Sequence, residues 1–555
     1  MSTAKREARS GKKWVLPVMI AAVVVIALLV LLLYKKPEEL ASGYIAGPSP
    51  AVEMLDEEGA VLGTLTRGSQ ITYVVVEEDE EQELVKIYPQ EDSPAWIPVE
   101  NLVLDVAQVV TTPAVYVRTP VSLTDEKGLT PYEPVEQGTA LTVTGYSGLQ
   151  ADGSVAAYQV KRTDGTGYIR ADYVTMEKST AMAHYDEEIY QLHASRGDSW
   201  GGGDAAGLDY YPRKKGDFAA QGNTMPEEVR ALYLNGGVLD ILPTYLEIAD
   251  NCGINAFVVD IVDGEAISYA SPVMQKYSPS AYADAISTME EYRTAIKTLK
   301  DAGYYVIGRI TVFNDANLAK DHPECVIADR SGSPMRISGM YWPSAYSRYV
   351  WQYKTDLAAE AVTEMGFNEI QFDYVRFPDG TWRYKDGEID YRNLYNESKA
   401  QAVQRFLTYA CDRLHEMGVY VSADVFGECA EDYVCAYGQY WPAISSVVDV
   451  ISGMPYPDHY NAQGSYLPWE HPYETLYTFG SLAAQRQKET ASPAIVRTWI
   501  QCYNAIREPY NTYGPDQVWA EIKALRDTGN TGGYMTWNGG SSAPKYRSLM
   551  SAFDK

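Results

Sequence analysis

In the stretch Glu369-Ile-Gln-Phe-Asp-Tyr-Val-Arg-Phe-Pro-Asp379, polar side chains alternate with apolar ones before the chain reaches a proline. Alternation in an extended strand places Glu369, Gln371 and Asp373 on one face. This polar face cannot lie against an apolar layer of helices, so we expect it to line an interior cavity. A buried carboxylate is costly, which makes Asp373 a candidate functional residue.

A second stretch, Val419-Tyr-Val-Ser-Ala-Asp-Val-Phe-Gly-Glu428, repeats this arrangement with Ser422 and Asp424 on one face. Neighbouring strands lie about 4.8 Å apart, so facing carboxyl groups of Asp373 and Asp424 would be roughly 5–6 Å apart. Two such carboxylates are the minimum needed to hydrolyse a glycosidic bond, and this spacing is typical of enzymes that retain the anomeric configuration. Glu428, at the strand end, is an alternative to Asp424 as the acid.

From residue 227 onward, apolar strands alternate with amphipathic helical segments, which predicts an α/β fold with a parallel sheet. Eight strands over this length are typical of a (β/α)8 TIM barrel. A doubly wound open sheet is the alternative, but no G-x-G-x-x-G follows the first strand. The predicted strands are 230–236, 255–262, 305–313, 369–377, 419–427, 448–456, 494–502 and 532–538.

Active sites of such barrels lie at the carboxyl ends of the strands, so polar and aromatic residues there are candidate substrate-binding residues. A structural alternative for Asp373 is a salt bridge with Arg309 or Arg376 that only fixes the barrel rim. The candidate substrate-binding residues are Asp260, Arg309, Asn314, Arg376, Tyr456, Asp458, His459, Arg497, Trp499, Gln501, Trp537 and Asn538.

The net charge and the cysteine and histidine content of the chain limit the partners and cofactors that we expect. The net charge of −28 argues against nucleic acid as a partner, because phosphate binding needs clustered cations. The six cysteines form no C-x-x-C pair, and a lone histidine at a strand end makes neither a metal site nor a catalytic triad, so we predict no metal and no cofactor. Cys429 and Cys435 are near enough in sequence to form a disulfide in an oxidising compartment.

Residues 14–34 are an uninterrupted apolar segment of about the length that crosses a bilayer as a helix. Five Lys or Arg residues precede it and only Lys35 and Lys36 follow, which predicts a single-pass protein of the cell membrane with a cytoplasmic amino terminus and an extracellular bulk. Cleavage after this segment, near Leu40-Ala-Ser-Gly43, is the alternative.

Two β-rich stretches precede the barrel and resemble each other. Gly68 and Trp96 are separated by 28 residues, and their counterparts Gly138 and Tyr168 by 30, which indicates a repeat. Each stretch resembles a bacterial Src-homology-3-like module. The resemblance implies that these modules hold cell-wall peptides or glycans, although they could also serve as spacers.

The barrel segment also resembles a known family. The runs Phe372-Asp-Tyr-Val-Arg-Phe-Pro378, Ser422-Ala-Asp-Val-Phe-Gly427 and Met454-Pro-Tyr-Pro-Asp-His-Tyr460 are similar to bacterial barrel proteins classed as glycoside hydrolases, related in fold to the α-amylase and α-galactosidase groups. The resemblance implies that Asp373 is the nucleophile. An amylase-like scheme implies Glu428 as the acid/base, whereas an α-galactosidase-like scheme implies Asp458.

The sequence therefore predicts a membrane-anchored glycoside hydrolase that acts on a cell-wall or capsular polysaccharide, with Asp373 as nucleophile and Asp424 or Glu428 as acid/base. A non-catalytic glycan-binding or cell-envelope scaffold protein is the main alternative. The predicted parts are a basic tail (1–13), a transmembrane helix (14–34), a linker (35–49), two Src-homology-3-like modules (50–106 and 107–176), a connecting segment (177–226) and the barrel (227–555).

Overall fold

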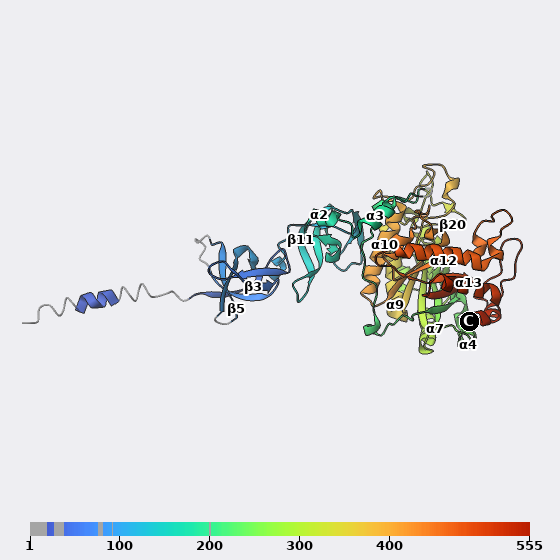
Figure 1. The fold of residues 1–555 in the computed structure, drawn as a ribbon, viewed down its shortest axis with the longest axis horizontal. Helices are drawn as coiled ribbons and strands as arrows, with labels where there is room; N and C mark the ends of the chain where they lie inside the picture. Colours follow the sequence, from blue (N-terminus) through green and yellow to red (C-terminus); the bar gives the residue numbers. More distant parts are fainter. Residues whose placement is uncertain (1–18, 27–37, 76–81, 91–92, 199–200) are drawn as a thin grey trace, which may run out of the picture. The chain divides into compact units, whose positions relative to one another are not determined.

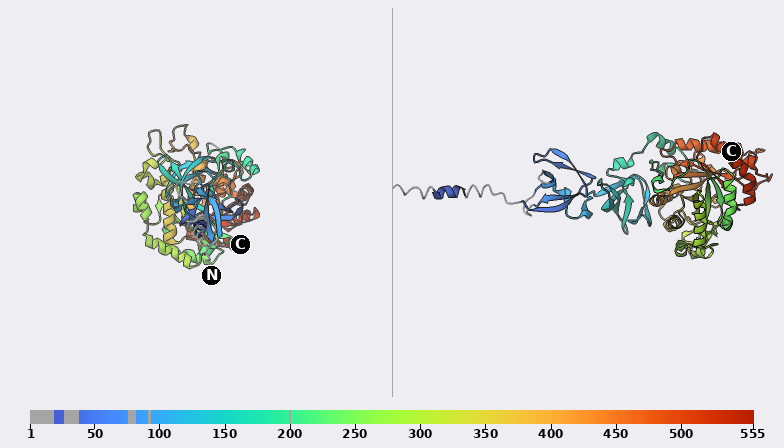
Figure 2. Two further views of the ribbon diagram at one scale, coloured as in Figure 1. Left: turned by 90° about the vertical axis from the view of Figure 1, so that its left-hand side faces the viewer. Right: turned by 90° about the horizontal axis from the view of Figure 1, so that it is seen from below.

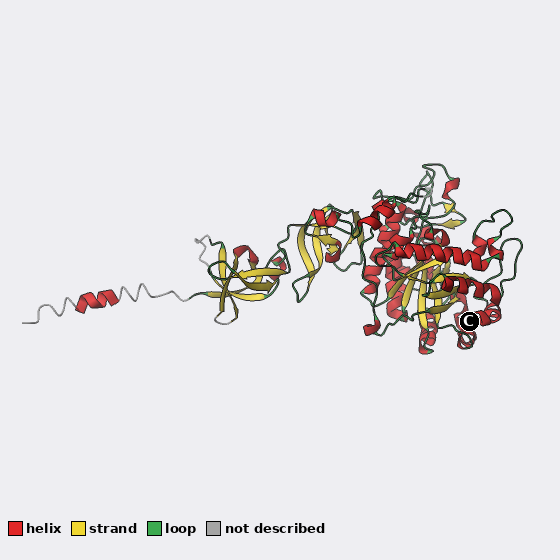
Figure 3. Cartoon of the chain, viewed as in Figure 1, coloured by secondary structure: helices red, strands yellow, loops and turns green. Residues whose placement is uncertain are grey.

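The computed structural model describes residues 19–26, 38–75, 82–90, 93–198 and 201–555. The chain forms two compact units. The first contains Met1–Thr112 and Gly148–Val155, and the second contains Pro113–Ser147 and Ala156–Lys555. Strands dominate up to about residue 175, and helices become the main element in the carboxyl-terminal part (Figure 3).

The first unit holds a small all-β module. Its strands follow one another in the sheet as β3-β2-β6-β5-β4-β1-β7. Ile45, Val85, Ile87 and Ile97 are almost fully buried between them and form its core. The strands are β1 (Leu40–Ile45), β2 (Ala51–Leu55), β3 (Val61–Thr66), β4 (Gln70–Val74), β5 (Leu84–Gln90), β6 (Ser93–Pro98) and β7 (Leu102–Val103).

A second β module opens the second unit. Its sheet order is β10-β9-β13-β12-β11-β8-β14, the same as that of the first module when strands are counted from each module's start. The repeat found in the sequence is therefore also a repeat of topology. The strands are β8 (Ala114–Val117), β9 (Val121–Thr124), β10 (Pro131–Val135), β11 (Ala140–Leu149), β12 (Val155–Arg162), β13 (Gly165–Arg170) and β14 (Val174–Thr175).

A parallel barrel follows, with helices outside the strands (Figures 1 and 2). The sheet order is β24-β23-β22-β21-β18-β16-β15-β26-β25. The barrel strands are β15 (Val229–Leu234), β16 (Ala256–Asp263), β18 (Tyr305–Thr311), β21 (Glu369–Asp373), β22 (Tyr420–Phe426), β23 (Val450–Met454), β24 (Ile495–Val496), β25 (Thr498–Gln501) and β26 (Gly533–Trp537). Short strands outside this order are β17 (Ala266–Ile267), β19 (Arg336–Ile337) and β20 (Met340–Tyr341).

Helices connect the barrel strands and bury one face against them. α7 and α10 begin with capping boxes, in which a Ser or Thr and the residue three positions later satisfy free backbone N–H groups. The helices are α2 (Lys178–Met182), α3 (Glu187–Ala194), α4 (Leu242–Asp250), α5 (Pro272–Tyr277), α6 (Pro279–Ala283), α7 (Met289–Asp301), α8 (Ala316–Asp321), α9 (Arg348–Met365), α10 (Lys399–His415), α11 (Trp441–Ser445), α12 (Pro472–Lys488), α13 (Pro515–Asp527) and α14 (Ala543–Phe553).

The barrel differs from the predicted fold class in its strand count. The seventh predicted strand, 494–502, is divided at Arg497: β24 pairs with β23, and β25 pairs with β26. The two end strands of the sheet, β24 and β25, are thus separated by one residue along the chain. The result is a nearly closed barrel of nine strands rather than eight. The pattern of apolar residues in 494–502 is continuous, so it could not reveal that the chain changes neighbours there.

The predicted transmembrane helix is the second correction to the fold class. Of residues 14–34, the structure describes only 19–26, as a short helix, and the remainder of the segment lies outside the described residues. Among the residues described, no helix has the length and apolarity needed to span a bilayer. This finding contradicts the prediction of a single-pass membrane protein.

Candidate active site

Asp373 and Asp424 lie side by side at the carboxyl ends of neighbouring strands. β21 and β22 pair in register up to Phe372 and Ala423, so the next residue on each strand is the acid. Gln371, Asp373, Ser422 and Asp424 are all buried, as expected for the face that lines the barrel interior. Only 5% of the surface of Asp373 and none of Asp424 is exposed.

Arg309, on β18, links the acids of the barrel mouth. Its Nη2 and Nε donate to Asp373 Oδ2 over 2.6 and 3.1 Å, and its Nη1 donates to Asp260 Oδ1 over 2.6 Å. Asp263 lies 3.3 Å away, and Asp424 Oδ2 lies 4.0 Å from Nε. One buried guanidinium therefore donates hydrogen bonds to three carboxylates and lies beside a fourth, and its single positive charge cannot neutralise all four.

Asp424 differs from Asp373 in its partners. The indole N–H of Trp499 donates to Asp424 Oδ1 over 2.7 Å, whereas Oδ2 accepts no hydrogen bond from the described residues. Burial and the charge of Asp373 raise the pKa of Asp424 well above its usual value, although Arg309 and the Trp499 hydrogen bond act in the opposite direction. Asp424 therefore holds a proton more readily than an ordinary aspartate, while Asp373 is held by Arg309.

Asp260 is the fourth acid beside Arg309. We call Arg309 and the four acids Asp260, Asp263, Asp373 and Asp424 the mouth network. The hydroxyl of Tyr233 donates to Asp260 Oδ2, and Arg309 donates to its other oxygen. Burial raises the pKa of Asp260 to about 7, against the lowering effect of Arg309. Tyr233 was missed by sequence reasoning, although it faces the interior near the end of β15, where the same strand-end rule applies.

The backbone turns sharply just after Asp373. Tyr374 has a φ of 50°, in the left-handed region that side chains other than glycine rarely adopt. In this conformation its N–H donates to Asp373 Oδ1 over 2.5 Å. Strained backbone of this kind is concentrated at functional sites, and here it fixes the second oxygen of the candidate nucleophile.

Aromatic rings surround the acids. The ring centroids of Trp537 lie 4.7 Å from Tyr233, 5.6 Å from Trp499 and 6.4 Å from Tyr456, with Tyr456 stacked roughly parallel to it. Trp537 also covers the Arg309 guanidinium at 5.3 Å. Tyr456, Trp499 and Trp537 thus form one apolar wall beside the carboxylates, as a site for sugar rings requires.

Arg497 does not lie in the mouth. It lies at the opposite end of the barrel, which we call the floor, where its partner Glu369 begins β21. Its Nη1 donates to both oxygens of Glu369, over 2.8 and 2.9 Å, and the hydroxyl of Tyr305 donates to Glu369 as well. Both members of this pair have no exposed surface. The structure therefore gives Arg497 a place in the buried interior rather than among the mouth residues.

The remaining candidates lie around the rim. Asp458 is buried and accepts hydrogen bonds from the Tyr503 hydroxyl and the Ile506 N–H, and His459 beside it is half exposed. Gln501 accepts a long bond from the Asp458 N–H. Within the described part of the chain, no hydrogen bond or ion pair joins these residues to Asp373 or Arg309, although the His459 ring packs edge-on against Tyr456 at 5.1 Å.

Glu428 and Arg376 face different neighbours. Glu428, in the short helical turn after β22, accepts hydrogen bonds from the hydroxyls of Tyr433 and Tyr437 and is only partly buried. Arg376 stacks on Phe426 at 4.1 Å and lies 3.7 Å from Asp379, not against Asp373. The alternative salt bridge of Asp373 is therefore made with Arg309 and not with Arg376.

Asn314 and Asn538 are buried at the ends of their strands. Asn314 accepts through its backbone oxygen from Thr311, and Asn538 makes a long bond to the Ser542 carbonyl. The residues that the structure describes contain no group of three His, Cys, Asp or Glu placed to hold a metal ion. All six cysteines are free thiols, so Cys429 and Cys435 are not bridged in this structure.

The chain was compared with known proteins, solved structures and protein families. No curated protein matches the chain. A hypothetical protein from Ruminiclostridium thermocellum ATCC 27405 is 32% identical over 35% of this chain and 97% of its own, with a TM-score of 0.30. The PgaB (BpsB) glycoside hydrolase domain from Bordetella bronchiseptica is 12% identical over 58% of this chain and 99% of its own, with a TM-score of 0.43. The Bacillus cereus spore cortex-lytic enzyme SleL is 11% identical over 59% and 75%, with a TM-score of 0.36.

A family model matches residues 231–542, which span the barrel from its first strand to the residues just after its last. That match covers more than half of the chain. The chain is a glycoside hydrolase, and it belongs to the family described as "Putative glycosyl hydrolase domain".

Proposed function

We propose that this glycoside hydrolase cleaves a cell-wall or capsular polysaccharide with retention of the anomeric configuration, using Asp373 as nucleophile and Asp424 as acid/base. The observation that carries the mechanism is the mouth network, in which both acids lie within 4.0 Å of the same guanidinium. Such closeness favours the short carboxylate separation of retaining enzymes over the wider gap that an inverting enzyme needs for its water.

In the first step, an oxygen of Asp373 bonds to the anomeric carbon while the bond from that carbon to the leaving oxygen breaks. The proton of Asp424 moves to the leaving oxygen. In the second step, water attacks the same carbon, gives a proton back to Asp424 and releases Asp373. Arg309 and the Tyr374 N–H hold the two oxygens of Asp373 for attack and stabilise it again as it leaves.

Glu428 remains the competing acid/base, on one specific observation. Asp424 has no exposed surface, whereas Glu428 is partly exposed and is held by two tyrosine hydroxyls. The chemistry of Asp424 fits better, because its raised pKa keeps the proton that an acid must donate.

The substrate class is supported by the two β modules that precede the barrel with the same strand order. They are similar to Src-homology-3-like modules, and repeated modules raise apparent affinity for a repetitive polymer because several copies can bind at once. A polysaccharide of the cell envelope is the repetitive polymer that such an enzyme would meet.

The test is to incubate the full chain with a panel of purified wall and capsular polysaccharides and to measure new reducing ends. The Asp373→Asn variant is the blank, and Asp379→Asn, which changes a half-exposed acid nearby, is the matched control. Proton NMR of the first product should show the configuration of the substrate. An inverted product would refute Asp373 as nucleophile, and binding without any reducing ends across the panel would favour a non-catalytic glycan-binding protein.

A further inference from the structure

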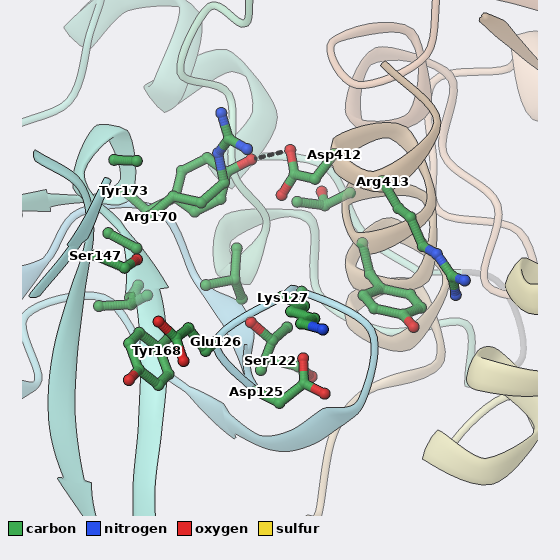
Figure 4. A pocket seen from close by; sticks show the side chains of 18 of the residues that line it. Ser122, Asp125, Glu126, Lys127, Ser147, Tyr168, Arg170, Tyr173, Asp412 and Arg413 are labelled. Atoms are coloured by element: carbon green, nitrogen blue, oxygen red, sulfur yellow. Dashed lines mark hydrogen bonds between the residues drawn. The ribbon is translucent and has the colours of Figure 1, made fainter. Parts of the chain in front are cut away.

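Hydrogen bonds and an ion pair connect the second β module to helix α10. Tyr409 donates to the Leu129 carbonyl over 2.5 Å, Arg405 forms an ion pair with Glu136 at 2.6 Å, and the Tyr173 hydroxyl donates to Asp412 over 2.5 Å. Figure 4 shows the bond between Tyr173 and Asp412, with Arg170 beside it. Because these contacts come from several elements, the seam between module and helix is a fixed feature of the second unit.

Two cavities lie along this seam and share the residues around the Tyr173–Asp412 bond. The smaller, drawn in Figure 4, has a volume of about 200 Å³. The larger, which we call the seam cavity, has a volume of about 600 Å³, within the range of small-molecule binding sites. The seam cavity is lined by the short helical turn η3 (Ala171–Tyr173) of the module, by the segment 211–218 and by the end of α10.

The seam cavity is rich in cations although the chain carries a net charge of −28. Five Lys or Arg side chains line it: Arg118, Arg170, Arg213, Lys214 and Lys215. Of its acids, Asp412 binds Arg213 and Tyr173, and Glu416 and Asp172 are paired with Arg170. Asp217 is exposed. Most of the negative charge in the lining is therefore already neutralised.

Three of the five cations form no ion pair within the described part of the chain. Lys215 donates to the carbonyl oxygens of Ser445 and Val448, which leaves Arg118 and Lys214. Arg118 lies over the Tyr211 ring at 4.1 Å and donates to the Asp172 carbonyl, and neither Arg118 nor the exposed Lys214 forms an ion pair within the described part of the chain. A planar guanidinium resting on an aromatic ring presents its edge in a fixed direction, the geometry with which arginine recognises phosphate and carboxylate groups.

The seam cavity is also remote from the catalytic mouth. The Gly216 N–H in its wall donates to Asp449, which directly precedes β23, and His415 bonds the same Asp449. Phe218 packs on Tyr420, the first residue of β22. These contacts place the seam cavity at the amino-terminal ends of the barrel strands, whereas Asp373 and Asp424 lie at the carboxyl ends.

We propose that the seam cavity is an anion-binding site, separate from the active site, which takes a phosphate or carboxylate group through Arg118 and Lys214. Such a group is present on phosphodiester polymers and on uronic-acid glycans, and both offer the same oxygen geometry to a guanidinium. The inference does not depend on which bond the barrel cleaves.

The experiment is calorimetric titration of the full chain with inorganic phosphate and, separately, with D-glucuronate, using glucose as the uncharged probe. We expect one of the two anions to bind and glucose not to bind. Binding should weaken at high ionic strength, because exposed charges are screened. Phosphate binding alone would indicate a phosphodiester ligand, and glucuronate binding would indicate a uronic-acid ligand.

Lys214→Glu and Arg118→Gln should each lower the affinity for the anion about tenfold or more, since each removes a charge-assisted contact. Lys488→Glu, an equal charge change at an exposed position of α12, is the matched control and should leave affinity unchanged. Asp373→Asn should also bind normally, which separates this proposal from the catalytic one. Failure of both anions to bind, or equal binding by both variants and the wild type, would overturn the proposal.

Discussion

Strand β21 carries two acids, each paired with an arginine from elsewhere in the barrel, and the two pairs differ in how completely they are enclosed. On β21, Glu369 in the floor binds Arg497 through both oxygens and also accepts from Tyr305. Four residues further on, Asp373 in the mouth shares Arg309 with Asp260, next to an Asp424 oxygen that accepts no hydrogen bond from the described residues. The floor pair is fully enclosed and meets no solvent, whereas the mouth acids lie at the open end of the barrel beside an Asp424 oxygen that is left to bind and react.

Asp373→Asn gives the largest expected effect on the mouth. Removing the attacking carboxylate should lower kcat by about 10⁴-fold or more. The thermal midpoint should stay within a few degrees, because Arg309 keeps its bond to Asp260. Reducing-end assays and a thermal melt of the same preparation measure both quantities. Retained turnover would show that Asp373 is not the nucleophile, and the mouth would then have no catalytic role to distinguish it from the floor.

Glu369→Gln should produce the opposite result. It leaves Arg497 buried without its counter-charge, so we expect the free energy of unfolding to fall by about 3–5 kcal/mol. Urea denaturation measures this change. The double variant Glu369→Gln with Arg497→Met is the control, and it should recover much of the loss because no unpaired charge remains. A single variant as stable as the wild type would contradict a stabilising role for the floor pair.

Asp424→Asn tests the assignment of the acid. Its loss should lower kcat/KM by about 10²–10³-fold. Since the acid works only when protonated, wild-type activity should fall as pH rises through the raised pKa of Asp424, and Asp424→Asn should lose this alkaline limb. Glu428→Gln is the comparison variant. If it abolishes the limb while Asp424→Asn keeps it, Glu428 is the acid/base.

Trp499→Phe should have the smallest effect. It keeps the aromatic ring but removes the N–H that donates to Asp424, and that hydrogen bond lowers the pKa of Asp424. Losing a bond worth about 1 kcal/mol should therefore move the alkaline limb upward by about 0.7 pH unit. A pH profile of kcat/KM measures the shift. A downward shift would show that Trp499 does not stabilise the charged form.

Local pattern predicted much of the barrel. The alternation in β21 and β22 predicted the face on which Asp373 and Asp424 lie, because side-chain direction in a strand depends only on position along the chain. The divided seventh strand was not predictable, because the switch of neighbours at Arg497 depends on where the barrel closes. The apolar segment 14–34 predicted a membrane span, and this prediction is contradicted by the described part of the chain.

What the sequence determined by itself was the order of strands and helices, the repeat of the β modules and the set of polar residues at strand ends, since these follow from spacing along one chain. Only the tertiary structure decided which of those residues meet. It placed Arg309 between Asp260 and Asp373 and placed Arg497 against Glu369 in the floor. Pairing between distant strands depends on barrel geometry, which no local pattern contains.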